Sequence, residues 1–192
     1  IGVGEHLGVT EGTLWVREGQ TGHLLFSDIS ANVIYKWMPP DQVTVFMENS
    51  GYTGDDVVNT GRQSRSGRLY VNQVGSNGLT LDRQGRLVIC AQGDRTLVRI
   101  EKDGVRTILA DRYEGRRLNG PNDVAAKSSG TLYFTDAGSG LRSEALRELP
   151  FHGLFMVKDG RVLLLDKNPQ GGTPNGIALS PDEKYLYVSA GP

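Results

Sequence analysis

The stretch GPNDVAAKSSGTLYFTD, residues 120–136, carries the pattern that decides the fold. Asn122 and Asp123 stand directly ahead of an apolar segment, a turn follows at Gly130, and a second apolar run extends over residues 132–134. Two apolar runs joined by a short turn are typical of a β-hairpin. Asn and Asp are also ordinary turn formers, so one such cluster has little meaning alone.

The same pattern occurs three more times. Asn77 heads GSNGLTLDRQGRLVICAQ, Asn175 heads TPNGIALSPDEKYLYVSA, and Glu11 takes the same place in VTEGTLWVREGQTGHLLFSD. These anchor residues, Glu11, Asn77, Asn122 and Asn175, recur at intervals of roughly 45 to 65 residues, the repeat size of propeller blades. The chain is therefore a repeat protein.

The residues two and four places after each anchor are mostly apolar. They are Thr13 and Trp15, Leu79 and Leu81, Val124 and Ala126, and Ile177 and Leu179. A period of two is typical of a strand with one buried face. Each copy therefore opens with a strand whose alternate side chains are expected to pack inward.

Two further strands follow the hairpin in each complete copy. Asp103-Gly104 and Asp159-Gly160 lie between apolar runs and suit two-residue turns. Residues 39–41, Pro-Pro-Asp, are expected to form the equivalent turn in the first copy. Four-stranded antiparallel repeats predict an all-β chain with a β-propeller fold, of which about three and a half blades are present. A β-sandwich would not return the same polar anchor at the head of each set of strands.

Composition excludes several classes of function. The chain has 192 residues, 26 glycines and a formal net charge of −1, which argues against nucleic acid or an anionic membrane as a partner. No apolar run is long enough to span a bilayer. The single cysteine, Cys90, excludes an internal disulfide and a thiolate zinc site, and its apolar strand predicts a packing role. Compartment and oligomeric state stay open.

In a blade of consecutive antiparallel strands, the start of the first strand lies on the same face as the connection between blades. Glu11, Asn122 and Asn175 are therefore expected to converge on the mouth of the central channel. One carboxylate and two amide oxygens suit a hard divalent cation, most simply Ca²⁺, although Zn²⁺, Mg²⁺ or Mn²⁺ are alternatives. Asn77 is interpreted as a turn former.

The three histidines, His6, His23 and His152, share no repeat position, and they are interpreted as surface residues or as residues that support a site. Two long connections, residues 48–74 and 138–151, fall on the same face as the anchors. Loops of this length in a compact domain are often walls of a binding site.

Seven segments carry a resemblance to a known family: EGTLW, GSNGLTLD, GRLVICAQGDRTLVRIEKDG, RRLNGPNDV, GTLYFTD, RELPFHGLF and TPNGIALSPDEKYLYVS. In this order they resemble the gluconolactonases of the senescence marker protein family, which includes luciferin-regenerating enzymes. The resemblance implies a six-bladed propeller that holds one divalent metal, usually calcium, and hydrolyses sugar lactones or related esters. It makes Glu11, Asn122 and Asn175 metal ligands, and places Arg117 and Asn119 near substrate contacts.

The chain also departs from the family pattern. The family's fourth ligand, an aspartate proposed as the general base, is expected after Pro192, and Ala190 stands where relatives often carry Asp. Residues 1–192 are therefore expected to form one propeller domain that is incomplete at its C-terminus. We expect little lactonase activity from these residues alone.

The chemistry implied is hydrolysis of a small-molecule lactone or ester, in which a metal polarises the carbonyl group and an activated water attacks it. Two alternatives stay open. The fold could serve as a non-catalytic interaction platform, in which the anchors are only turns. A phosphotriesterase-like hydrolase could use the same metal ring and differ only in its pocket lining.

Overall fold

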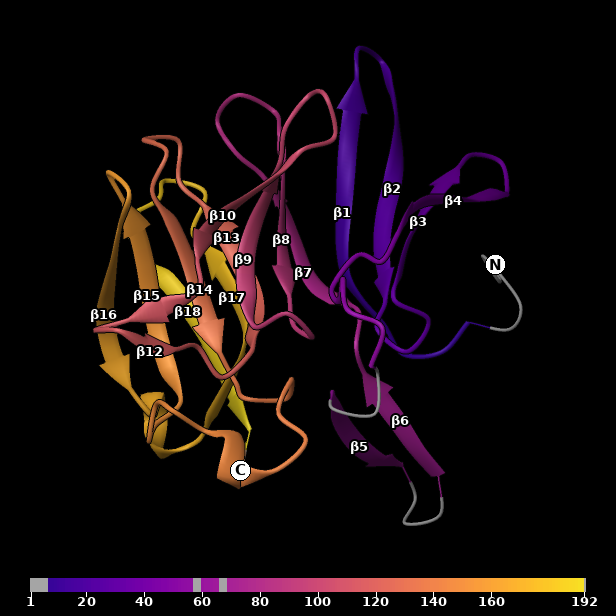
Figure 1. Ribbon diagram of the computed structural model, residues 1–192. Coiled ribbons are helices and arrows are strands. Elements are labelled where there is room, and N and C mark those ends of the chain that lie inside the picture. The colour runs from indigo at the N-terminus through magenta and orange to yellow at the C-terminus, as the bar shows by residue number, and fades with distance from the viewer. Residues whose placement is uncertain (1–6, 57–59, 66–68, 192) are drawn as a thin grey trace.

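The computed structural model describes residues 7–56, 60–65 and 69–191 (Figure 1). Strands make up nearly all of the regular structure in these ranges, and the helices described there are two single 3-10 turns, η2 (Glu144–Leu146) and η3 (Pro169–Gly171). Within the described part of the chain, neither is long or apolar enough to cross a lipid bilayer. The all-β class predicted from the repeats is confirmed.

Three four-stranded antiparallel sheets follow one another along the chain. Sheet 1 comprises β1 (Thr10–Glu18), β2 (Thr21–Asp28), β3 (Val33–Met38) and β4 (Gln42–Glu48). Sheet 2 comprises β7 (Ser76–Leu81), β8 (Leu87–Ala91), β9 (Thr96–Ile100) and β10 (Arg106–Ala110). Sheet 3 comprises β13 (Pro121–Ala126), β14 (Leu132–Asp136), β15 (Gly153–Lys158) and β16 (Arg161–Lys167).

Three two-stranded hairpins complete the structure. They are β5 (Gly61–Arg65) with β6 (Leu69–Gln73), β11 (Arg112–Tyr113) with β12 (Arg116–Arg117), and β17 (Thr173–Leu179) with β18 (Leu186–Gly191). The last pair is the hairpin expected from the fourth copy of the repeat. The first strands of successive copies are neighbours, β1 against β7, β7 against β13, and β13 against β17 (Figure 1). This is the blade-by-blade arrangement of a propeller.

A β-bulge interrupts the pairing at the head of every first strand. The register shifts between Glu11 and Leu14 in β1, and equivalent shifts begin at Ser76, Pro121 and Pro174. A bulge places two residues opposite one on the partner strand and turns a side chain away from the regular alternation. The anchor residues therefore lie where the strand can direct polar side chains out of the sheet.

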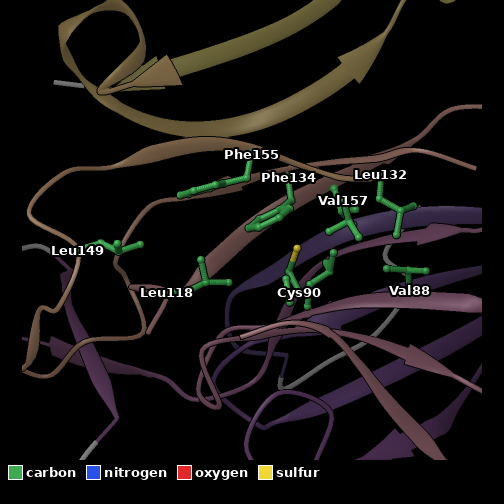
Figure 2. Close-up of a cluster of buried hydrophobic side chains, with 11 residues drawn as sticks. Val88, Cys90, Leu118, Leu132, Phe134, Leu149, Phe155 and Val157 are labelled. Atoms are coloured by element: carbon green, nitrogen blue, oxygen red, sulfur yellow. The ribbon is translucent and has the colours of Figure 1, made fainter. Parts of the chain in front are cut away.

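Two apolar clusters hold the sheets together. The larger lies between sheets 2 and 3, where the rings of Phe134 and Phe155 stack with centroids 5.3 Å apart (Figure 2). Cys90 is fully buried in this cluster, and burial raises the pKa of its thiol, which confirms the predicted packing role. The smaller cluster, around Leu25 and Ile89, joins sheets 1 and 2.

The expected alternation is wrong for the first copy. Trp15 is 48% exposed, whereas Leu14 and Val16 pack against the cluster between sheets 1 and 2. The residue two places after the anchor is buried in the other copies, at Leu79 and Val124 for example. The bulge of β1, with Gly12 at a φ of 58°, shifts the buried face by one residue.

Two turn predictions and one loop prediction have different outcomes. Asp159-Gly160 forms the predicted two-residue turn, with both φ values positive and Lys158 paired with Arg161. The turn at Asp103-Gly104 contains three residues instead, 102–104, because Glu101 donates a backbone hydrogen bond across it to Val105. The connection 48–74 is not loop throughout, since it contains the β5–β6 hairpin.

Candidate functional site

The heads of β1, β7, β13 and β17 line one polar hollow of about 210 Å³. Its lining residues are Glu11, Gly12, Thr13, Asn77, Leu79, Asn122, Asp123, Asn175 and Gly176. The structure therefore brings together the three predicted ligands, Glu11, Asn122 and Asn175, from strands far apart in the sequence. Their role as metal ligands stays a prediction.

Asn122 lies at the head of β13 with only 5% of its surface exposed. Its side chain forms no hydrogen bond with any residue in the described part of the chain. A buried amide normally has hydrogen-bond partners, because desolvation without them costs about 1–3 kcal/mol. A turn-forming asparagine hydrogen-bonds nearby backbone groups through its side chain. The Asn122 amide makes no such bond within the described residues, and it lies in the lining of the hollow instead.

Asn77, interpreted from the sequence as a turn former, occupies the same place in sheet 2 and lines the same hollow. Its side-chain nitrogen donates to Gln92 Oε1 at 3.0 Å, which fixes the orientation of the amide. No described residue donates to its side-chain oxygen, so this oxygen is left as an acceptor for the hollow. The repeat pattern already contained this residue as the second anchor.

Asp123 is a second carboxylate in the lining, and both of its oxygens are engaged. Oδ1 accepts from the backbone nitrogen of Val124, and Oδ2 accepts from that of Ile177, each at 2.9 Å. Burial raises the pKa of the Asp123 carboxyl, and the two backbone donors oppose this shift. Asp123 thus fastens the head of β17 to β13.

Hydroxyl groups fix the backbone of two anchors across the gap between copies. Ser27 Oγ donates to the carbonyl oxygen of Asn77 at 2.8 Å, and Thr135 Oγ1 donates to that of Asn175 at 2.6 Å. Ser27 and Thr135 occupy corresponding places near the ends of β2 and β14. Sheet 1 thereby positions Asn77, and sheet 3 positions Asn175.

A buried carboxylate holds the segment that leads to Asn122. Asp136 accepts from the backbone nitrogens of Asn119 at 2.8 Å and Gly120 at 2.6 Å. Burial raises the pKa of this carboxyl to about 6, against the lowering effect of the two hydrogen bonds. Asp28 plays the matching part in the first copy, accepting from the backbone nitrogen of Gly8 at 2.7 Å.

The two residues expected near substrate lie outside the lining of the hollow. Asn119 has no exposed surface, and its side-chain nitrogen donates to the carbonyl oxygens of Leu149 and Phe151 at 3.2 and 2.9 Å. Arg117 donates from Nη2 to the carbonyl oxygen of Asp94 at 3.1 Å. These contacts hold the loops around the mouth, and substrate contact by either residue stays a prediction.

The two long connections meet beside this mouth, as their place in the repeat predicts. Gly61 donates a backbone hydrogen bond to the carbonyl oxygen of Gly140 at 3.1 Å, and Thr60 forms an isolated bridge with Leu141. A side chain at position 61 would collide with the carbonyl oxygen of Ser139. The close approach therefore depends on glycine.

The donor chemistry of the hollow fits a hard cation. Its polar groups are carboxylate and amide oxygens, which Ca²⁺ accepts readily. Among the described residues, no group of three or more His, Cys, Asp or Glu side chains is placed to hold a metal ion, so a cation here would depend on the amide oxygens as well. His23 is buried in β2 beside Glu18, so its expected surface location is wrong. His152 is absent from the lining, and His6 lies outside the described residues.

Residues 9–192 match the family model described as the SMP-30/gluconolactonase/LRE-like region. The chain belongs to this family. It is 35% identical over 185 residues to a gluconolactonase of Zymomonas mobilis subsp. mobilis, a match that covers 94% of this chain and 48% of that protein. The chain thus spans about half the length of this curated gluconolactonase.

Solved structures of the family have the same fold. A gluconolactonase from Xanthomonas campestris superposes with a TM-score of 0.77 at 28% identity, over 99% of this chain and 57% of that one. Regucalcin from Agrobacterium tumefaciens, a calcium-binding protein, superposes with a TM-score of 0.60 at 18% identity, over 98% of this chain and 52% of that one. The second match shows the fold alone. The SMP-30/gluconolactonase fold is thus shared by this chain.

Proposed function

We propose that this chain acts in the hydrolysis of sugar lactones and holds a divalent cation, most simply Ca²⁺, with Glu11, Asn122 and Asn175. The observation that carries this proposal is the Asn122 amide, which is nearly buried in the hollow and has no hydrogen bond within the described residues. The gluconolactonases among its relatives support the substrate class, and the carboxylate and amide oxygens of the hollow support the cation.

Each side chain has a separate task in this proposal. Glu11 supplies the negative charge, and the oxygens of Asn122 and Asn175 supply neutral ligands, with Asn77 as a further acceptor in the same lining. Asp123 is a positioning residue, because its oxygens accept backbone N–H groups.

When bound, the cation would supply Lewis-acid polarisation of a lactone carbonyl. A carboxylate is required to accept the proton of the attacking water. Arg117 and Asn119 are proposed substrate contacts by the family resemblance.

Calorimetric titration with calcium chloride tests the cation site. We expect Asn122→Ala to weaken binding at least tenfold, a loss of about 1.4 kcal/mol, because a ligand oxygen disappears from a small donor set. Asn122→Asp keeps an oxygen donor and should bind calcium at least as tightly as the unmodified chain. Gln42→Ala, which removes an exposed amide at the start of β4, is the matched control and should have no effect.

Equal calcium affinity in Asn122→Ala and the unmodified chain would return Asn122 to the turn-former interpretation. A substrate screen with and without chelator separates the remaining alternatives. Turnover of gluconolactone that chelator abolishes supports the proposed lactonase, whereas turnover of phosphotriesters alone supports the second hydrolase class. An interaction platform predicts neither turnover nor stabilisation by calcium.

A further inference from the structure

A second hollow of about 800 Å³ lies at the opposite ends of the inner strands, between sheets 2 and 3. It is lined by the turns that follow β7, β13 and β15, and by parts of β9 and β10. Arg83 in the first of these turns is six residues beyond Asn77, or about 20 Å along an extended strand. This second hollow is therefore separate from the candidate cation site.

The lining of the second hollow is basic, although the whole chain is nearly neutral. Its basic side chains are Arg83, Arg86, Arg99, Lys127 and Lys158, and its carboxylates are Asp82 and Asp159. Glu101 adds one more carboxylate beside the lining, through its ion pairs with Arg86 and Arg99. The Glu183 carboxylate lies beside Lys127 as a fourth, so five cationic groups face four carboxylates, which leaves an excess of one positive charge.

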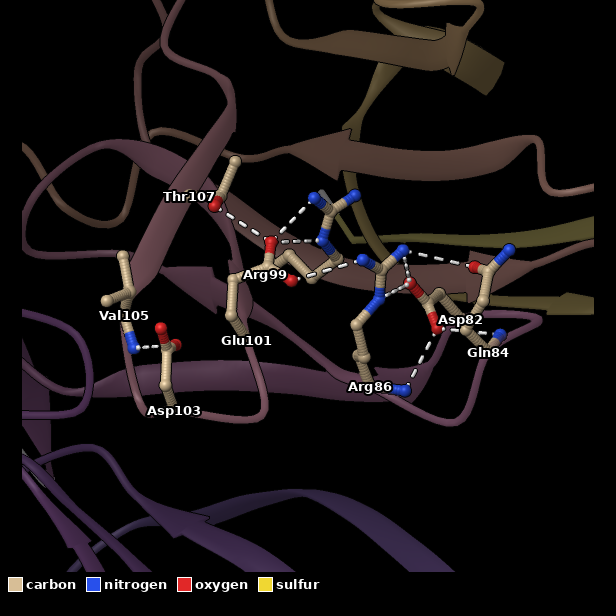
Figure 3. Close-up of polar contacts among 8 residues, drawn as sticks. All are labelled: Asp82, Gln84, Arg86, Arg99, Glu101, Asp103, Val105 and Thr107. Atoms are coloured by element: carbon tan, nitrogen blue, oxygen red, sulfur yellow. Dashed lines mark hydrogen bonds and ion pairs between the residues drawn. The ribbon is translucent and has the colours of Figure 1, made fainter.

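Ion pairs account for two of the five cations and make one wall rigid (Figure 3). Arg86 lies between Asp82 Oδ2 at 2.7 Å and Glu101 Oε2 at 3.1 Å, and Arg99 contacts Glu101 Oε1 at 2.6 Å. Thr107 Oγ1 donates to the same Glu101 oxygen at 2.8 Å. All three carboxylate–arginine contacts are less than one quarter exposed, so the wall is already ordered without a ligand.

Arg83 and Lys158 are the cations that this network does not neutralise. Within the described part of the chain neither forms an ion pair, and both are exposed on facing turns of the hollow. Lys127 adds a third positive charge, and its Nζ donates to the carbonyl oxygen of Glu183 at 3.0 Å. Charges on three separate turns suit a ligand that carries several negative groups.

The floor of the hollow is apolar and has hydroxyl groups at one side. Met156, Val157 and Leu132 contribute aliphatic surface, and Ile108 is 60% exposed at its edge. Ser129 and Thr131 supply hydroxyl groups in the turn between β13 and β14. A concave site with an apolar floor and a few converging polar groups, of about 300 to 1,000 Å³, is typical of small-molecule binding.

We propose that this basic hollow binds a small organic anion with two or more negative charges, of the chemistry of a nucleoside polyphosphate. Arg83 and Lys158 contact the phosphate groups, and the apolar floor receives the ring system. The pairing of Arg86 and Arg99 with carboxylates keeps that wall from attracting phosphate on its own. The site is independent of the lactone chemistry at the other end of the strands.

Calorimetric titration of the 192-residue chain with ATP in the presence of EDTA tests this site. We expect saturable binding that weakens with added potassium chloride, and a loss of at least tenfold in affinity in the double variant Arg83→Gln/Lys158→Gln. Both residues are exposed, and circular dichroism should show an unchanged fold. Lys102→Gln is the matched control, because Lys102 has the same place as Lys158 in the KDG turn of sheet 2 and lies outside the hollow.

Two further ligands define the chemical class. Adenosine should bind much more weakly than ATP, because it lacks the charges, and inorganic tripolyphosphate should bind more weakly than ATP, because it cannot use the apolar floor. The proposal is overturned by absence of ATP binding, by equal losses in the double variant and Lys102→Gln, or by equal affinity for ATP and either probe.

Discussion

At the scale of single residues, the buried carboxyl of Asp136 holds the backbone segment that leads to Asn122 in the candidate site. Its carboxyl has no exposed surface and accepts from the two backbone nitrogens that precede β13. Burial favours the protonated form and outweighs the two hydrogen bonds and the charges of Arg95 and Arg147, so the pKa rises from its ordinary value of 3.8 to about 6. The segment that carries Asn122 therefore depends on a carboxyl that titrates in mildly acidic solution.

This shift predicts a pH dependence of stability. Between about pH 4 and pH 6 the folded chain binds the Asp136 proton more tightly than the unfolded chain does. The contribution of Asp136 to the free energy of unfolding is thus full below pH 4 and falls by about 3 kcal/mol as the pH rises through 6. Urea denaturation at a series of pH values measures it.

Asp136→Asn removes the titrating group and keeps one oxygen acceptor, so this part of the pH dependence should disappear in the variant. The free energy of unfolding should then differ between the two proteins by an amount that changes between pH 4 and pH 6. Parallel stability curves over this range would show that Asp136 does not titrate as described.

At the scale of elements, the bulge at the head of each first strand decides what the strand presents to the hollow. In β1 the bulge contains Gly12, whose φ of 58° lies in the left-handed region. A side chain there would also collide with the carbonyl oxygen of Asn77, so β1 can approach β7 closely only with glycine. The same carbonyl accepts a hydrogen bond from Ser27 Oγ at 2.8 Å, which ties β2 to the head of β7.

Gly12→Ala is therefore expected to destabilise the fold by about 3 kcal/mol, from backbone strain together with the collision. Gly19→Ala is the matched control, because Gly19 has a φ of 61° and no atom within 4 Å of the added methyl group. It should cost only about 1 kcal/mol, the strain of the left-handed conformation. Equal losses of unfolding free energy in the two variants would contradict the close approach of β1 and β7.

At the scale of the whole molecule, one face of sheet 1 is apolar and open to solvent. Cross-strand pairs place Trp15, Leu24, Trp37 and Val43 on this face, and Val45 lies two residues further along β4. Trp15 is 48% exposed and Val45 is 53% exposed. Large exposed apolar patches on a folded chain commonly drive association.

The 192-residue chain is therefore expected to self-associate in a concentration-dependent way, which sedimentation velocity would measure. Replacing both Trp15 and Val45 by threonine should lower the associated fraction, since it removes the largest exposed side chains of this face. Val105→Thr is the control, because Val105 is 57% exposed and belongs to the turn between β9 and β10 of sheet 2, not to the apolar face of sheet 1. An equal reduction in the control would exclude the open face as the cause.

The sequence by itself determined the repeat, the four-stranded unit and the anchors. These features depend on local spacing: a polar residue, an apolar run of period two, a glycine turn and a second run can be recognised without knowing what each strand contacts. The Asp159-Gly160 turn was predictable for the same reason, because a two-residue turn needs positive φ at both positions. The repeat position and the family resemblance together predicted the candidate metal ligands Glu11, Asn122 and Asn175.

Only the tertiary structure decided which side chains face the hollow. Trp15 and Leu14 exchange faces because a bulge shifts the alternation by one residue, and nothing in the local pattern reveals that shift. Asn77 and Asn119 also differ in their surroundings. The side chain of Asn77, at the head of β7, is held at the hollow by Gln92, whereas that of Asn119, ahead of β13, is bound to the carbonyl oxygens of Leu149 and Phe151. Such partners are distant in sequence, so the use of a polar side chain is settled only when the sheets pack.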